Sequence, residues 1–168
     1  MNTGLTRLLT AVCVVLAATG AARAEWGPET VALGVGLEEV FDQEGRRAVY
    51  SAELGFTEWG AGLAPVAELN VTEAGAVFAG LGLAWRWEAE ALPLGLRVGV
   101  APGYYDQGRD KFLGGNFQVY SFIEAGWRVT KAHGLGLRLA HLSNASTADQ
   151  NPGTEIVSLI YEFKLAGR

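Results

Sequence analysis

Along most of this chain, apolar side chains alternate with small or polar ones, and this pattern limits the fold more than any other feature. Residues 76–87, AVFAGLGLAWRW, show it clearly. Successive side chains of an extended strand point to opposite faces, so a period of two predicts strands with one apolar and one polar face. Eight segments repeat the pattern between turn residues, at about 31–41, 47–56, 61–71, 76–87, 94–104, 117–129, 135–144 and 155–163. The sequence therefore predicts an all-β protein.

Charged residues are spaced singly on the polar faces of these segments. They are Glu38, Glu53, Glu68, Arg86, Arg97, Glu124, Arg128, Arg138 and Glu162. Carboxylates and guanidiniums nearly balance, as an enclosed polar core requires, because unpaired buried charge is costly. The apolar faces would then face lipid. A soluble sandwich or lipocalin-like barrel is the alternative, but its surface would be mostly apolar. We therefore predict an eight-stranded antiparallel transmembrane β-barrel of the outer-membrane type.

The first 24 residues have the features of a secretory signal peptide. Arg7 precedes an apolar run at 8–19, and Ala22-Arg23-Ala24 forms a small-x-small cleavage site. We expect cleavage after residue 24 and a single barrel domain over 25–168. The lone cysteine, Cys13, would be removed. With two histidines left and no thiol, we expect no metal or cofactor, and a net charge of −5 gives no support for nucleic-acid binding.

The connections between the predicted strands suggest an orientation. If the barrel begins in the periplasm, the longest connections, 105–116 and 144–154, are extracellular. The tryptophans then lie near the periplasmic rim, where an aromatic girdle is expected. They are Trp26, Trp59, Trp85, Trp87 and Trp127.

Three polar residues interrupt the apolar face of the last predicted hairpin at its loop end. On the strand that begins at Leu135, His141 and Ser143 share a face with the leucines, and Glu155 shares a face with the apolar residues of the last strand. A histidine, a serine and a carboxylate can act as base, nucleophile and orienting group. The amide of Asn144, or a nearby backbone N–H, could stabilise an oxyanion. The alternative is that these are polar residues above the hydrocarbon boundary.

The motif His141-Leu142-Ser143-Asn144, followed by Asn151-Pro152-Gly153-Thr154-Glu155 on the last strand, closely resembles the lipid A 3-O-deacylases (PagL family) of Gram-negative outer membranes. The specific part of the resemblance covers about 135–163. It implies hydrolysis of the ester at the 3-position of the lipid A glucosamine, with release of a 3-hydroxyacyl chain. It also implies His141, Ser143 and Glu155 as the catalytic triad, and Asn144 as a contributor to the oxyanion hole.

The implied substrate is lipid A or lipopolysaccharide among the lipids of the outer membrane. Its acyl chains would lie against apolar residues of the last hairpin, namely Leu135, Leu137, Leu139, Val157 and Leu159. Two alternatives remain: a non-enzymatic barrel that serves structure or adhesion, and an enzyme that transfers the acyl chain to another lipid. Both a monomer and an oligomer are compatible with this interpretation.

Overall fold

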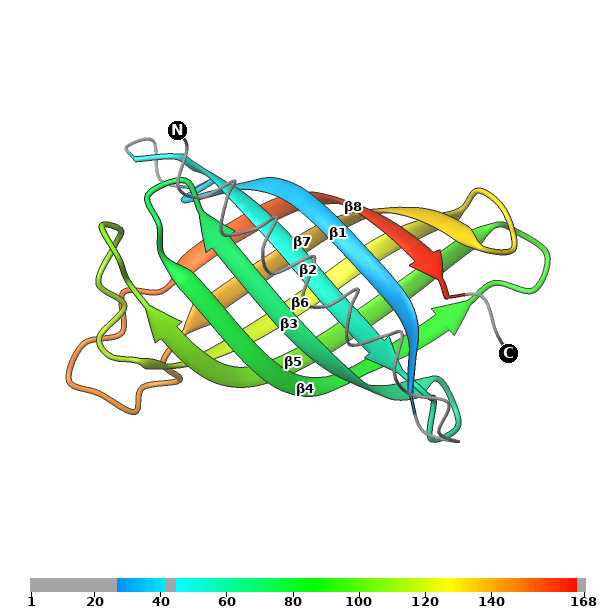
Figure 1. The fold of residues 1–168 in the computed structure, drawn as a ribbon, viewed down its shortest axis with the longest axis horizontal. Helices are drawn as coiled ribbons and strands as arrows, with labels where there is room; N and C mark the ends of the chain where they lie inside the picture. The colour runs from blue at the N-terminus through cyan, green and yellow to red at the C-terminus, as the bar shows by residue number, and fades with distance from the viewer. Residues whose placement is uncertain (1–26, 42–44, 166–168) are drawn as a thin grey trace.

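Eight antiparallel strands close into one barrel in the computed structural model (Figure 1). The strands are β1 (Pro28–Glu38), β2 (Arg47–Phe56), β3 (Leu63–Thr72), β4 (Val77–Glu88), β5 (Leu94–Asp106), β6 (Phe117–Arg128), β7 (His133–Ser143) and β8 (Thr154–Lys164). Each pairs with its neighbour in sequence, and β1 also pairs with β8. The structure describes residues 27–41 and 45–165, so the predicted signal peptide lies outside them. The predicted eight-stranded all-β barrel is confirmed.

No helix in these described ranges is long and apolar enough to cross a membrane.

Some bounds of the predicted strands were wrong, and three of the differences have a local reason. β1 ends at Glu38, because the next residue, Glu39, has a left-handed φ of 55° that turns the chain out of the sheet. β3 starts at Leu63, because Ala61 has a φ of 52° within the preceding turn. His133, expected in a turn, is the first residue of β7, and its Nδ1 hydrogen-bonds the Tyr161 hydroxyl at 2.7 Å.

The barrel interior holds the predicted network of paired charges. Arg138 is 1% exposed and lies 2.8 Å from Glu53, 3.5 Å from Glu68 and 2.7 Å from Glu124. Arg97 shares two of these partners, Glu53 and Glu124. Every member of the network belongs to a strand, so side chains from all around the barrel meet at its axis. The charged face is therefore the inside of the barrel, as an outer-membrane barrel requires.

The outer surface of the barrel is apolar. Exposed leucines, valines and aromatic residues cover it, and Leu81 and Leu159 are 72% and 66% exposed. The exposed tryptophans Trp59, Trp85, Trp87 and Trp127 lie at one end of the barrel, and Trp26 is outside the described residues. We call this the turn end, because short turns join its strands. The opposite end, at the left in Figure 1, carries the connections 107–116 and 144–153 and is called the loop end.

The connection 107–116 folds inward and caps the loop end. Leu113 is 1% exposed and belongs to the buried apolar cluster inside the barrel. Asp110 accepts a 2.5 Å bond from Arg47 and a 2.6 Å bond from the Thr72 hydroxyl. Gln118 donates hydrogen bonds to the carbonyl oxygens of Leu113 and Gly115. These contacts hold the connection over the interior and give the neighbouring connection, 144–153, a fixed surface to pack on.

Candidate active site

His141 and Glu155 meet on the outer wall of the barrel at its loop end. They are directly opposite in the pairing of β7 with β8. The His141 Nδ1 lies 3.3 Å from the Glu155 Oε1, and the two side chains are 46% and 36% exposed. A carboxylate beside one ring nitrogen fixes which nitrogen carries the proton and leaves the other free to act as a base. The two strands therefore assemble a histidine–carboxylate pair on an apolar surface.

Ser143 lies on the same outer face, two residues beyond His141 at the end of β7. Among the described residues, no hydrogen bond joins its hydroxyl to the His141 ring. Rotation about one bond changes the position of a serine hydroxyl between staggered states. Catalytic hydrogen bonds in enzymes without substrate are often long and form fully only when substrate binds. The structure thus brings His141 and Glu155 into contact and leaves Ser143 as their neighbour.

A second serine borders His141 and was missed in the sequence. Ser121 is opposite His141 in the pairing of β6 with β7, and its hydroxyl donates a weak 3.4 Å hydrogen bond to the His141 carbonyl oxygen. Ser121 interrupts the apolar outer face of β6 between Val119 and Ile123. This interruption could have identified it from the sequence. Two outward serines therefore flank the histidine.

The side chain of Asn144, the predicted oxyanion candidate, lies on the inner side of the barrel wall. Successive side chains alternate between faces, so Asn144 points inward while Ser143 points outward, and Asn144 is 1% exposed. Its Nδ2 donates to the carbonyl oxygens of Leu113, at 3.1 Å, and Gln150, at 2.6 Å. Both amide hydrogens are therefore used. The side chain ties the connection 107–116 to the connection 144–153.

The variant Asn144→Ala distinguishes a structural role, in which the side chain links the two connections, from a direct role as an oxyanion donor. Because the side chain ties the two connections together, we expect Asn144→Ala to lower the free energy of unfolding by about 1–3 kcal/mol, since two hydrogen bonds are lost. Urea unfolding of the protein in lipid vesicles measures this loss. A direct oxyanion donor gives a different result: kcat falls by roughly 10²- to 10³-fold and the stability is unchanged.

The connection 144–153 leaves β7 through a strained turn. Ala145 and Ser146 both have left-handed φ values, 52° and 61°, which non-glycine residues rarely adopt. The carbonyl oxygen of Asn144 accepts bonds from the Thr147 backbone and hydroxyl, at 3.1 and 2.7 Å. Strained backbone of this kind is concentrated at functional sites, where the surrounding structure maintains it. The turn begins two residues beyond Ser143.

Apolar side chains cover the outer face of β7 and β8 between the candidate triad and the turn end. The predicted acyl-chain contacts on β7 all lie outward: Leu135 and Leu137 are 54% exposed and Leu139 is 41% exposed. On β8, Leu159 is exposed and Val157 is half-buried. β7 and β8 pair along this length, so the five residues form one continuous apolar strip that leads from the turn end toward His141.

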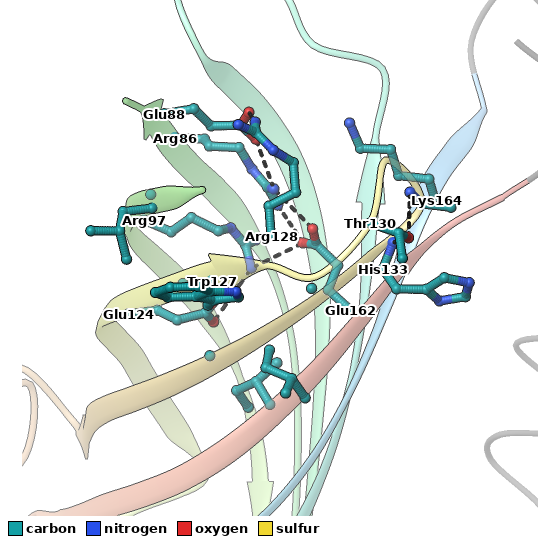
Figure 2. Close-up of a pocket in the computed structure, with 18 of the residues that line it drawn as sticks. Arg86, Glu88, Arg97, Glu124, Trp127, Arg128, Thr130, His133, Glu162 and Lys164 are labelled. Atoms are coloured by element: carbon teal, nitrogen blue, oxygen red, sulfur yellow. Dashed lines mark hydrogen bonds and ion pairs between the residues drawn. The ribbon is translucent and has the colours of Figure 1, made fainter. Parts of the chain in front are cut away.

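A separate pocket opens at the turn end (Figure 2). Its arginines pair with its carboxylates: Arg86 binds Glu162, and Arg128 binds Glu88 at 2.6 Å. Within each pair the two charges neutralise one another at the mouth of the barrel. The pocket lies at the opposite end of the strands from His141, and we assign it no part in the candidate triad.

Comparison with known proteins agrees with this geometry. The family model of the lipid A 3-O-deacylases (PagL) matches residues 30–164. The chain is similar to the lipid A deacylase PagL of Bordetella bronchiseptica (strain ATCC BAA-588 / NCTC 13252 / RB50), with 30% identity over an alignment of 89 residues; the match covers 46% of this chain and 50% of that protein. The match thus spans about half the length of the relative.

Solved structures share the barrel. A crystal structure of the outer membrane enzyme PagL covers 81% of this chain and 99% of its own, with a TM-score of 0.66 and 21% identity. Neisserial surface protein A (NspA) covers 84% of this chain and 100% of its own, with a TM-score of 0.65 and 10% identity. The fold is that of an outer-membrane β-barrel. Within that class, the family match over most of the barrel shows that the chain belongs to the lipid A 3-O-deacylase (PagL) family.

Proposed function

We propose that this outer-membrane protein hydrolyses the ester at the 3-position of the lipid A glucosamine and releases a 3-hydroxyacyl chain. The observation that carries the proposal is the contact between His141 and Glu155, 3.3 Å apart on an otherwise apolar outer wall. Ionisable residues are costly on a lipid-facing surface, and those found there commonly mark a functional site. Together with the family membership, the pair supports an ester hydrolase.

In the proposed mechanism Ser143 attacks the ester carbonyl carbon while His141 takes the hydroxyl proton on Nε2. Glu155 holds Nδ1–H and stabilises the positive ring that results. The tetrahedral intermediate collapses, and the glucosamine oxygen leaves with the proton from His141. The acyl chain is now an ester of Ser143. Water, deprotonated by His141, attacks this ester, and the 3-hydroxy fatty acid departs as the serine regains its proton.

The position of the site suits a lipid substrate. We place the loop end at the outer leaflet, where the ester bonds of lipid A lie near the boundary between hydrocarbon and headgroups. The acyl chains then run along the apolar strip formed by Leu135, Leu137, Leu139, Val157 and Leu159, which continues from His141 into the hydrocarbon. The substrate reaches the triad from the side, so the closed and charged interior need not open.

Mass spectrometry of lipid A tests the proposed reaction. We expect lipid A from Gram-negative cells that express the full-length protein to lose one 3-hydroxyacyl group, and the free 3-hydroxy fatty acid to appear in equal amount. A matched strain with an empty vector is the control. Loss of the group without free acid would instead identify an acyltransferase. Unchanged lipid A, from cells whose protein is correctly inserted, would support a structural barrel, since the fold alone does not imply catalysis.

A further inference from the structure

The position that a side chain of residue 153 would occupy is filled by the ring of His141. Gly153 is the last residue before β8 and is buried. A Cβ atom at this position would lie 2.9 Å from the His141 Cε1 and 3.3 Å from its Nε2. Contacts below 3.0 Å are essentially never made by real Cβ atoms. The space beside the ring therefore exists only because residue 153 has no side chain.

Residue 153 must be glycine for a second reason, its backbone conformation. Comparison with Gly45 separates the effect of the backbone conformation from the effect of contact with the ring. Its φ of 61° is in the left-handed region, where side chains are strained. Gly45, at the same end of the barrel, has a φ of 91°, and among the described residues the atom nearest to its Cβ position is Arg47 Nη2, 4.0 Å away. An alanine at Gly45 would be strained but would make no close contact with a described residue. An alanine at Gly153 would be strained and would also push the histidine.

The two neighbours of the ring act on different edges. Glu155 lies at Nδ1, while a Cβ atom at Gly153 would meet Cε1 and Nε2. The connection that carries Gly153 is itself fixed, because Asn144 donates to the carbonyl oxygen of Gln150. The ring thus lies between a carboxylate and a backbone segment whose place is determined by the capped end of the barrel.

We propose that Gly153 is a positioning residue for His141: its missing side chain lets the connection 144–153 pack on the imidazole and hold Nδ1 at Glu155. The catalytic consequence of this role rests on the proposed function, whereas the positioning itself does not. Gly153→Ala places a methyl group on the ring, which turns the ring away from the carboxylate. Since a displacement of about 1 Å in an active site can reduce the rate by 10²-fold, we expect a loss of that order in deacylation.

Nuclear magnetic resonance of the histidine rings tests the positioning directly. The chain has two histidines, so labelling histidine with ¹⁵N gives two ring systems, and His133→Gln assigns them. With the rings neutral, ¹⁵N chemical shifts report which nitrogen carries the proton. We expect the proton on Nδ1 of His141 in the wild type and in Gly45→Ala. In Gly153→Ala and in Glu155→Ala we expect a mixture of the two tautomers.

A second variant separates backbone strain from contact with the ring. Asparagine tolerates a left-handed φ better than alanine does, so Gly153→Asn keeps the turn but still adds a Cβ atom. We expect the same change in the His141 signals from both variants in inserted protein. A wild-type His141 spectrum in folded Gly153→Asn would overturn the proposal. If the tautomer changes as expected but no form of the protein deacylates lipid A, the positioning role stands and the proposed function fails.

Discussion

Ser143→Ala will reduce the release of 3-hydroxyacyl chains from lipid A on the order of 10⁴- to 10⁶-fold, because the variant lacks the oxygen that forms the acyl-enzyme in the proposed mechanism. Ser143 is outward-facing at the end of β7, so the substitution removes no interior contact, and we expect the barrel to fold as the wild type does. The rate is measured with purified protein in vesicles that contain lipid A, by quantifying free 3-hydroxy fatty acid.

Ser121→Ala is the matched control. It removes an outward hydroxyl from the strand next to His141, at nearly the same height on the barrel wall. We expect this variant to keep activity within a few-fold of the wild type. The reverse result, an active Ser143→Ala and an inactive Ser121→Ala, would assign the nucleophile to β6 and contradict the triad proposed here.

Arg138→Ala will produce the largest loss of stability, about 3–5 kcal/mol in the free energy of unfolding. Arg138 lies between Glu53, Glu68 and Glu124, and its side chain is 1% exposed. Without it, the three carboxylates stay inside the barrel, and Arg97 reaches only two of them. Removal of one partner from a buried charge network is costly because it leaves charge without compensation. Urea unfolding of the variant in lipid vesicles measures the effect.

Arg128→Ala provides the comparison for this prediction. Arg128 also forms an ion pair, with Glu88 at 2.6 Å, but the two side chains are 41% and 38% exposed. Exposed pairs contribute about 0–1 kcal/mol, because water screens them. We therefore expect a small loss for Arg128→Ala. Equal losses for both variants would show that the interior network is as well hydrated as the turn end.

The period of two in the sequence was enough to predict the barrel, because each strand must place one face inside and the other in lipid. Arg138 and Glu53 could be assigned to the interior from this alternation alone. The same alternation predicted that His141 and Glu155 lie close together, because the strand ends of an antiparallel hairpin determine which residues are opposite one another. Periodic patterns thus predicted both the architecture and the histidine–carboxylate pair.

The connections could not be predicted in this way, because they have no period. The inward fold of 107–116 depends on the buried bonds of Asp110 and on Leu113, which come from residues distant in sequence. For the same reason the inward hydrogen bonds of Asn144 could not be predicted. Its carbonyl partners, Leu113 and Gln150, become its neighbours only when both connections have folded. In the sequence Gly153 is typical of a turn glycine, and its closeness to the His141 ring depends on the folded connection.

Labelling with an alkyl fluorophosphonate tests the central claim, that the outer wall carries a serine activated by His141. The reagent bonds covalently to an activated serine oxygen and needs no knowledge of the natural substrate. We expect peptide mapping of the folded wild-type protein in vesicles to find the adduct on Ser143, and His141→Ala to show at most a trace. An adduct on another residue, or no adduct in a preparation that deacylates lipid A, would contradict the account.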